Sequence, residues 1–327
     1  MRTRTPIALS AVTSLAVLAA CAGMSSGAGS GRHVTQGLAT VVSENLYTGC
    51  REQLPNLRKT PLGRITAFDG TVITVPAETA IGSAPQAAPL YSDCEQVRPA
   101  RLADVSVDAV PVVEVDRDGD VVSGFVVADN YFELYVNGKL VAVDPVPYTP
   151  FNSAIVRFRV KRPYTIAVKL VDWEEKLGLG MEWFPPNQNW YVGDGGFIAR
   201  FSDGTVTDRS WRAQTYYIAP LTNPDDVVER GDVRDTTALG RTHPLAKPPT
   251  CEARCYAVHW DIPRGWQAPG FDDRRWPQAY EYTDAEIGIS PALISYSRFP
   301  EAFTGARWIW SSNLVYDNVV LVRKRVQ

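Results

Sequence analysis

Aromatic and amide side chains gather in one short segment whose composition suits sugar binding: Trp183-Phe184-Pro185-Pro186-Asn187-Gln188-Asn189-Trp190-Tyr191. Sugars stack their C–H groups on aromatic faces and bond their hydroxyls to amides and carboxylates. The two prolines predict a loop between the tryptophans. The candidate ligand-binding residues are therefore Trp183, Asn187, Asn189, Trp190 and Tyr191. In the alternative interpretation, the aromatic side chains close one end of the core.

Three carboxylates alternate along a second segment, as they do in calcium-binding loops. Asp116, Asp118 and Asp120 could turn their oxygens toward one hard cation, which makes a structural calcium the candidate cofactor. No glutamate stands where an EF-hand-type loop would close, because Ala128 and Asp129 occupy that stretch. The alternative is a solvated hairpin turn.

The chain carries few residues that would serve catalysis. It has three histidines, no G-x-S-x-G elbow, no H-E-x-x-H pair and no phosphate-binding glycine loop. A glycosidase needs only two carboxylates at no fixed sequence spacing, so Glu174, Glu175 and Glu182 stay open as an alternative. The sequence favours a non-catalytic module.

The N-terminus carries an export signal. A basic start precedes an apolar run over residues 7–20 that is too short to cross a bilayer as a mature helix. The run ends in Leu18-Ala19-Ala20-Cys21, which resembles a bacterial lipobox with Cys21 as the lipidated residue. Ala22 then favours the outer membrane if the envelope is Gram-negative. An ordinary signal peptide is the alternative.

The other cysteines fit an oxidising compartment, because lipidation of Cys21 leaves an even set of four. We expect the disulfides Cys50–Cys94 and Cys251–Cys255, since each pair lies within one local segment. The competing interpretation of the second pair is a zinc site with His243 and His259 nearby.

Bulk properties exclude one class of partner. The net charge is −3 and 21% of residues are charged, whereas nucleic-acid binding needs a concentrated basic face. The expected partners are the membrane, through the lipid anchor, and a glycan or envelope polysaccharide.

Strand patterns dominate the chain from residue 112 onward. We expect one hairpin between residues 112–115 and 121–127, and a second at Asn137-Gly138 that pairs Val136 with Lys139, Leu134 with Val141 and Phe132 with Val143. Alternation over residues 156–160 and 166–170 predicts two further strands, with Lys169 facing outward. Helical periodicity is scarce, so the predicted fold class is all-β.

Three motifs resemble known domains. Residues 129–138 are similar to the "D-x-x-x-E-L-Y-V-N-G" hairpin of galactose-binding-like jelly rolls. Phe271-Asp272-Asp273 with Trp276, and Trp308-Ile309-Trp310, resemble elements of the sugar-binding domains of family 2 glycoside hydrolases and α-rhamnosidases. The resemblance implies a β-sandwich in which Phe271 and Trp276 pack while Asp272 and Asp273 cap a turn.

The motif order differs from that of the resembled domains, where the hairpin usually comes last. A circular permutation would explain the difference, and we then expect residues 319–326 beside the strands near 110–127.

The expected organisation is a signal peptide and lipobox (1–21), a flexible tether (22–36), a small β-rich region (37–105) and a galactose-binding-like β-sandwich (106–327) with a loop insertion near 221–250. The predicted function is a membrane-anchored, extracytoplasmic lipoprotein with a carbohydrate-binding-like module. The alternatives are a structural or protein-interaction module of the cell envelope and a glycoside hydrolase.

Overall fold

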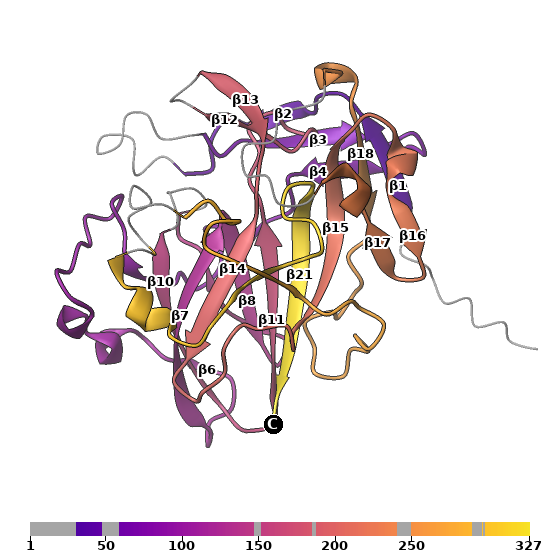
Figure 1. The fold of residues 1–327 in the computed structure, drawn as a ribbon. Coiled ribbons are helices and arrows are strands. Elements are labelled where there is room, and N and C mark those ends of the chain that lie inside the picture. The colour runs from indigo at the N-terminus through magenta and orange to yellow at the C-terminus, as the bar shows by residue number, and fades with distance from the viewer. Residues whose placement is uncertain are drawn as a thin grey trace, which may run out of the picture.

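The computed structural model describes residues 31–47, 59–146, 152–184, 188–240, 250–289, 296 and 298–327. Two seven-stranded sheets form its body (Figure 1). Sheet I has the order β1 (Arg32–Gln36), β18 (Tyr256–Trp260), β15 (Arg212–Leu221), β21 (Asp317–Val326), β11 (Tyr164–Val171), β8 (Tyr131–Val136) and β9 (Lys139–Val143). Sheet II has the order β19 (Tyr280–Tyr282), β20 (Trp308–Trp310), β14 (Gly196–Phe201), β7 (Asp120–Asp129), β10 (Ser153–Val160) and β5 (Ala88–Tyr91), with β6 (Val113–Glu114) beside β10.

The main core lies between the two sheets and confirms the all-β class. Val126 and Phe158 of sheet II pack in one apolar cluster with Val168 and Val320 of sheet I. The ring of Phe158 is fully buried, and burial of such a side chain stabilises the fold by about 1.5–3 kcal/mol. Residues from 112 onward and the late tryptophan strands share this core, as the sequence predicts.

The last strand, however, does not lie where the permutation hypothesis places it. β21 lies in sheet I between β15 and β11, whereas β7 lies in sheet II between β10 and β14. The expectation that residues 319–326 pair with the strands near 110–127 is therefore wrong. Seven of the ten residues of β21 are buried in succession, which is typical of a central strand covered on both faces, but this pattern fits the centre of either sheet and does not specify the neighbouring strands.

The Asn137-Gly138 hairpin forms with one shift of register. Both residues have positive φ (49° and 83°), as a type I′ turn requires, and Val136 pairs with Lys139 as predicted. A bulge then intervenes, so that Leu134 pairs with Ala142 and Glu133 with Val143. The two other predicted pairs are wrong because the bulge adds one residue on the β9 side.

The predicted hairpin between residues 112–115 and 121–127 does not form. β6 pairs in parallel with β10, and β7 pairs with it antiparallel. The chain passes around the end of β10 through Gly119, where a Cβ atom would stand 2.2 Å from the carbonyl carbon of Val160. Only glycine permits so close an approach of two backbones.

A second apolar cluster covers the other face of sheet I. Tyr131, Trp173 and Leu321 pack there against Ile65 and Val75, which come from the N-terminal region. This cover explains why Lys169, expected to face outward, is only 8% exposed. Its ammonium group pairs with the Glu133 carboxylate at 2.7 Å.

Some strands of the N-terminal region belong to the two main sheets, and the others form a small separate sheet. β2 (Thr40–Ser43), β3 (Leu62–Thr66) and β4 (Val72–Val75) form a three-stranded sheet, the β2–β4 sheet, while β1 and β5 belong to sheets I and II. Residues 32–36, which the sequence assigns to the tether, are the strand β1. These residues belong to sheet I and not to a tether, because Val34 and Thr35 pair with Val258 and Ala257 of β18.

Short elements fill the connections. A hairpin joins β12 (Met181–Phe184) to β13 (Asn189–Val192), and another joins β16 (Val228–Arg230) to β17 (Val233–Asp235). The predicted loop near 221–250 is thus structured between 224 and 239, and residues 241–249 lie outside the described part. The 3-10 helices are η1 (Leu102–Asp104), η2 (Val107–Ala109), η4 (Pro224–Asp226), η5 (Thr237–Leu239), η6 (Glu252–Arg254) and η7 (Pro300–Phe303).

Candidate functional site

The predicted ligand-binding residues lie on the β12–β13 hairpin. Trp183 and Trp190 are directly opposite across its two strands, with ring centroids 5.3 Å apart. Tyr191 is 8% exposed and meets the ring of Phe184 edge-on. The hairpin thus brings four of the five predicted residues together, with Asn189 at its exposed end; Asn187 lies outside the described residues.

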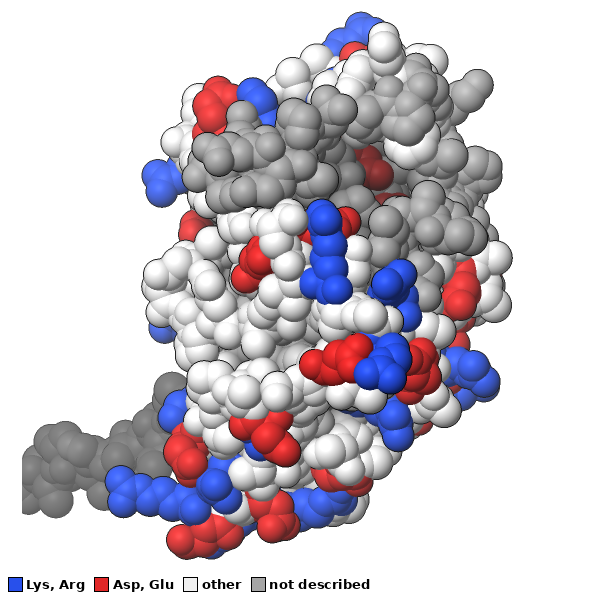
Figure 2. All heavy atoms as spheres, turned by 90° about the vertical axis from the view of Figure 1, so that its left-hand side faces the viewer, with Lys and Arg blue, Asp and Glu red and all other residues white. Residues whose placement is uncertain are grey.

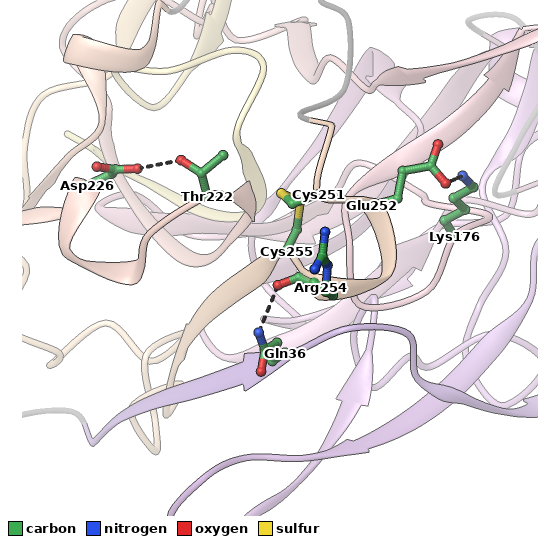
Figure 3. The surroundings of a disulfide bond; sticks show 8 residues. All are labelled: Gln36, Lys176, Thr222, Asp226, Cys251, Glu252, Arg254 and Cys255. Carbon is green, nitrogen blue, oxygen red and sulfur yellow. Dashed lines mark hydrogen bonds and ion pairs between the residues drawn. A yellow bond between two sulfur atoms is a disulfide. The ribbon is translucent and has the colours of Figure 1, made fainter.

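Packing already accounts for much of this aromatic surface. The Lys176 ammonium group stands 4.5 Å from the ring centroid of Trp190, and the ring also packs against Leu179 and Met181. Lys176 in turn pairs with Glu252 at 3.1 Å, next to a disulfide bond (Figure 3). The hairpin base is therefore tied to the η6 segment, and one face of Trp190 is covered by a cation.

That disulfide joins Cys251 to Cys255 as predicted, with an S–S distance of 2.05 Å. The bond overturns the zinc interpretation, because these sulfurs are bonded to each other and the buried His259 stacks on Tyr217 at 4.4 Å. Cys94 is also disulfide-bonded. Cys50, Cys21 and His243 lie outside the described residues.

The predicted calcium ligands have other roles in the fold. Asp116 accepts a hydrogen bond from the backbone N–H of Lys161, and Asp118 pairs with the Lys161 ammonium group at 3.2 Å. Asp120 begins β7. Among the described residues, no three His, Cys, Asp or Glu side chains are grouped so as to hold a metal ion.

The hydrolase candidate Glu174 is fully enclosed at the foot of the same hairpin. Its carboxylate accepts hydrogen bonds from the Tyr217 hydroxyl (2.9 Å) and from the backbone N–H groups of Leu179 and Gly180. Burial raises the pKa of Glu174 to about 7 against the effect of these donors. The contacts hold the turn before β12 in place.

A pocket of about 550 Å³ opens at the β19 edge of sheet II. Its walls come from β14, β19, the turn after β19, and the start of β20. The lining residues are Ile198, Glu281, Tyr282, Thr283, Asp284, Ala285, Tyr296, Ala306, Arg307 and Trp308. This volume lies within the range of about 300–1,000 Å³ that is usual for small-molecule sites.

Asp284 is the best-positioned polar group of this pocket. Its Oδ1 atom accepts hydrogen bonds from the indole N–H of Trp308 (3.0 Å) and from the Tyr296 hydroxyl (3.4 Å). Burial, together with the charge of Asp284, raises the pKa of Tyr296 to about 12, so this hydroxyl stays a donor. Two aromatic residues thus fix a carboxylate that is itself exposed.

The backbone that carries Asp284 is held by a reciprocal pair of hydrogen bonds. The Glu286 carboxylate accepts from the Thr283 backbone N–H (2.8 Å), and the Thr283 hydroxyl accepts from the Glu286 backbone N–H. This is the capping-box arrangement, and its signature Thr-x-x-Glu stands in the sequence. The pocket is not among the features predicted from the sequence, although this Thr-x-x-Glu signature directly after an aromatic strand marks the turn.

The other charged residues that line the pocket are one acidic and one basic side chain. Glu281 accepts a hydrogen bond from the backbone N–H of Arg209 at 2.8 Å, and Arg307 is exposed. Figure 2 shows acidic and basic side chains interspersed over one side of the molecule. Such a surface suits an uncharged polar ligand better than a polyanion.

Comparisons with family models, with curated proteins and with solved structures find no match to this chain.

Proposed function

We propose that the protein is a lipid-anchored, extracytoplasmic lipoprotein whose β-sandwich binds a carbohydrate without turning it over. The observation that carries this proposal is the pocket in which Trp308 and Tyr296 hold the Asp284 carboxylate beside aromatic walls. An exposed carboxylate that is fixed in place accepts hydrogen bonds from sugar hydroxyls, and the pocket has a volume usual for small-molecule sites. The pocket is the better site than the hairpin, because Lys176 covers Trp190.

Other features support the location. The Cys251–Cys255 disulfide is compatible with an oxidising compartment. No helix in the described part of the chain is long and apolar enough to cross a bilayer. The anchor in this proposal is Cys21 of the lipobox-like segment. The two-sheet body is also consistent with the galactose-binding-like jelly roll that the motifs resemble.

The test is a glycan screen followed by calorimetric titration with the best ligand. Asp284→Asn keeps the shape of the side chain but removes the charge, and should weaken binding by about tenfold or more, because hydrogen bonds to a charged group contribute about 1.5–3 kcal/mol. The matched control is Glu301→Gln in η7, an exposed carboxylate outside the pocket lining.

Failure of every screened glycan to bind would refute the proposal, as would equal affinity of Asp284→Asn and the unaltered protein. Turnover of a bound glycoside that Asp284→Asn abolishes would show a hydrolase in place of a binding module.

A further inference from the structure

One histidine, His33, is held between two carboxylates at the start of the described part of the chain. It lies on β1, the outermost strand of sheet I. Its Nδ1 atom stands 2.6 Å from the Asp69 carboxylate, and its Nε2 atom stands 3.3 Å from the Asp261 carboxylate. The His33 side chain is 12% exposed, so protein surrounds most of the ring. Both ring nitrogens therefore contact acidic groups.

The two carboxylates belong to segments that are far apart in the sequence. Asp69 lies in the turn between β3 and β4, and its other carboxylate oxygen accepts a hydrogen bond from the backbone N–H of Thr71 at 2.9 Å. Asp261 directly follows β18. The ring thus connects the N-terminal end of β1 to the β2–β4 sheet on one side and to the end of β18 on the other.

Only the protonated ring can donate to both carboxylates. A neutral imidazole carries one N–H, so its other nitrogen is an acceptor, whereas the imidazolium donates from both nitrogens. An ionised carboxylate only accepts hydrogen bonds. Loss of the ring proton would therefore leave one of the two carboxylates facing a nitrogen lone pair, and that contact would open.

The surroundings of the ring favour its charged form. Burial alone would lower the pKa of His33, but the hydrogen bonds and charges of Asp69 and Asp261 outweigh burial and raise this pKa above its ordinary value of about 6.5. The backbone N–H of Thr71 and the His33 ring lower the pKa of Asp69 to about 2. Asp69 is therefore charged throughout the range in which the ring titrates.

The other titratable groups near the ring keep their state or lie further away. His259 pairs with His33 across β1 and β18, but burial lowers the pKa of His259 to about 3, so it stays neutral. Tyr217 stacks on His259 and donates to the Glu174 carboxylate, at the far end of this row. Arg32 pairs with a glutamate of β16 at 3.3 Å and, as the neighbouring residue of a strand, points to the opposite face.

The other end of β1 is held by groups that do not titrate near neutral pH. The side-chain amide of Gln36 donates to the carbonyl oxygen of Arg254 at 3.0 Å, beside the disulfide (Figure 3). The backbone N–H of Gly37 donates to the carbonyl oxygen of Cys255. A change of protonation at His33 would therefore act on one end of the strand.

Two backbone hydrogen bonds lie next to the ring and join the same segments. The backbone N–H of Phe68 donates to the carbonyl oxygen of Val34 at 2.9 Å, and the backbone N–H of Asp261 donates to that of Gly31 at 3.3 Å. Opening of the ring contacts would expose these two amide protons to exchange with solvent.

We propose that His33 is a pH-sensitive clasp: the protonated ring fixes the β3–β4 turn and the end of β18 to β1, and loss of the ring proton loosens this end of the strand. A group whose pKa is raised in the closed form contributes stability at low pH that is lost as the pH rises through that pKa. In the proposed lipoprotein, β1 is the first described strand after Cys21, so the clasp would set how firmly the sandwich is held to the chain that leads to the anchor. The clasp itself is independent of the glycan pocket.

The first experiment follows the three histidines of the full chain by nuclear magnetic resonance from about pH 5 to about pH 9. His33→Gln identifies the His33 signal, whose midpoint should lie above about 6.5. Asp69→Asn and Asp261→Asn should each lower this midpoint by about 0.5 pH unit or more, because one of the two charges that retain the proton is lost. The matched control, Asp118→Asn, removes an exposed carboxylate that pairs with Lys161 and should leave the midpoint unchanged.

Amide hydrogen exchange then tests whether the contacts open. After correction for the intrinsic effect of pH, exchange at Phe68 and Asp261 should speed up by at most about tenfold per pH unit as the ring loses its proton, whereas exchange at Gly37 should not. In His33→Gln these two amides should exchange at the fast rate at every pH. In Glu174→Gln their pH dependence should persist, because the row from Glu174 does not control the clasp.

A His33 midpoint at or below about 6.5, or one that neither aspartate variant lowers, would overturn the proposal. Exchange at Phe68 that keeps its pH dependence in His33→Gln would also overturn it, since another group would then control this contact. Glycan affinity of His33→Gln should equal that of the unaltered protein, so failure of this inference is distinguishable from failure of the sugar-binding proposal.

Discussion

Two neighbouring aspartates of one sequence motif should differ sharply in their effect on stability. Asp273 accepts from the guanidinium of Arg323 at 2.7 Å, and that arginine is 2% exposed. Asp272 bonds the exposed Arg274 and accepts from its backbone N–H, so it caps the turn as the resemblance implies. The resemblance assigns the same turn-capping role to Asp273, but its carboxylate contacts Arg323.

The expected cost of Asp273→Ala follows from what remains around Arg323. Removal of one partner from a buried ion pair typically costs about 3–5 kcal/mol, because the other charge stays buried without its counter-charge. The guanidinium keeps its hydrogen bonds to the carbonyl oxygens of Trp266 and Ala268, and its place over the Phe271 ring. We therefore expect the lower end, about 3 kcal/mol. Asp272→Ala should cost far less, since solvent screens its ion pair and only the turn cap is lost.

Urea unfolding, followed by tryptophan fluorescence, measures both variants against the unaltered protein. Asp273→Ala should lower the midpoint with an unchanged slope, and Asp272→Ala should lower the midpoint much less. Arg323→Met together with Asp273→Ala should recover part of the loss, because it removes the unpaired charge and keeps an apolar side chain of similar length. Equal midpoints for the two single variants would refute this account of the 266–276 segment.

Two further predictions concern buried groups. Gly195→Ala would place a Cβ atom 2.2 Å from the ring of Trp310. The overpacking should cost about 1–3 kcal/mol and lower the melting temperature clearly. Gly270→Ala, whose Cβ atom would meet nothing within 4 Å, should leave the melting temperature unchanged. Burial raises the pKa of Glu174 to about 7 in the folded state. The folded protein therefore keeps a proton that the unfolded chain has already released. The contribution of this proton to stability is lost as the pH rises through about 7. In unfolding curves recorded from about pH 5 to about pH 8, Glu174→Gln should therefore flatten the fall in stability by as much as about 1.4 kcal/mol per pH unit; an unchanged slope would contradict this assignment.

The predictions that the structure confirms depend mainly on local chemistry. The Asn137-Gly138 turn, the Cys251–Cys255 bond and the strand alternation over 156–160 follow from rules that act over a few residues. Which strands become neighbours depends on contacts distant in sequence, and there the predictions failed. β21 was misplaced because a buried strand looks alike wherever it lies in a sheet.

The site was harder to predict than the fold for a related reason. Asp284 and Trp308 are 24 residues apart and meet only because β19 pairs with β20. In the sequence, Trp308 belongs to the Trp308-Ile309-Trp310 motif, and nothing local connects it with Asp284. Conversely, the tryptophans at 183 and 190 looked available in the sequence, and nothing local indicated that Lys176 would lie over one of them.

The position of β21 bears on the order in which the two sheets can form. Its neighbours β11 and β15 lie more than ninety residues earlier in the chain, yet the two halves of sheet I are joined only when β21 pairs with both strands. The earlier strands therefore wait with unpaired edges, and pairings across so long a separation form slowly. Loss of this ten-residue strand would therefore leave sheet I as two half-sheets, one of β1, β18 and β15 and the other of β11, β8 and β9.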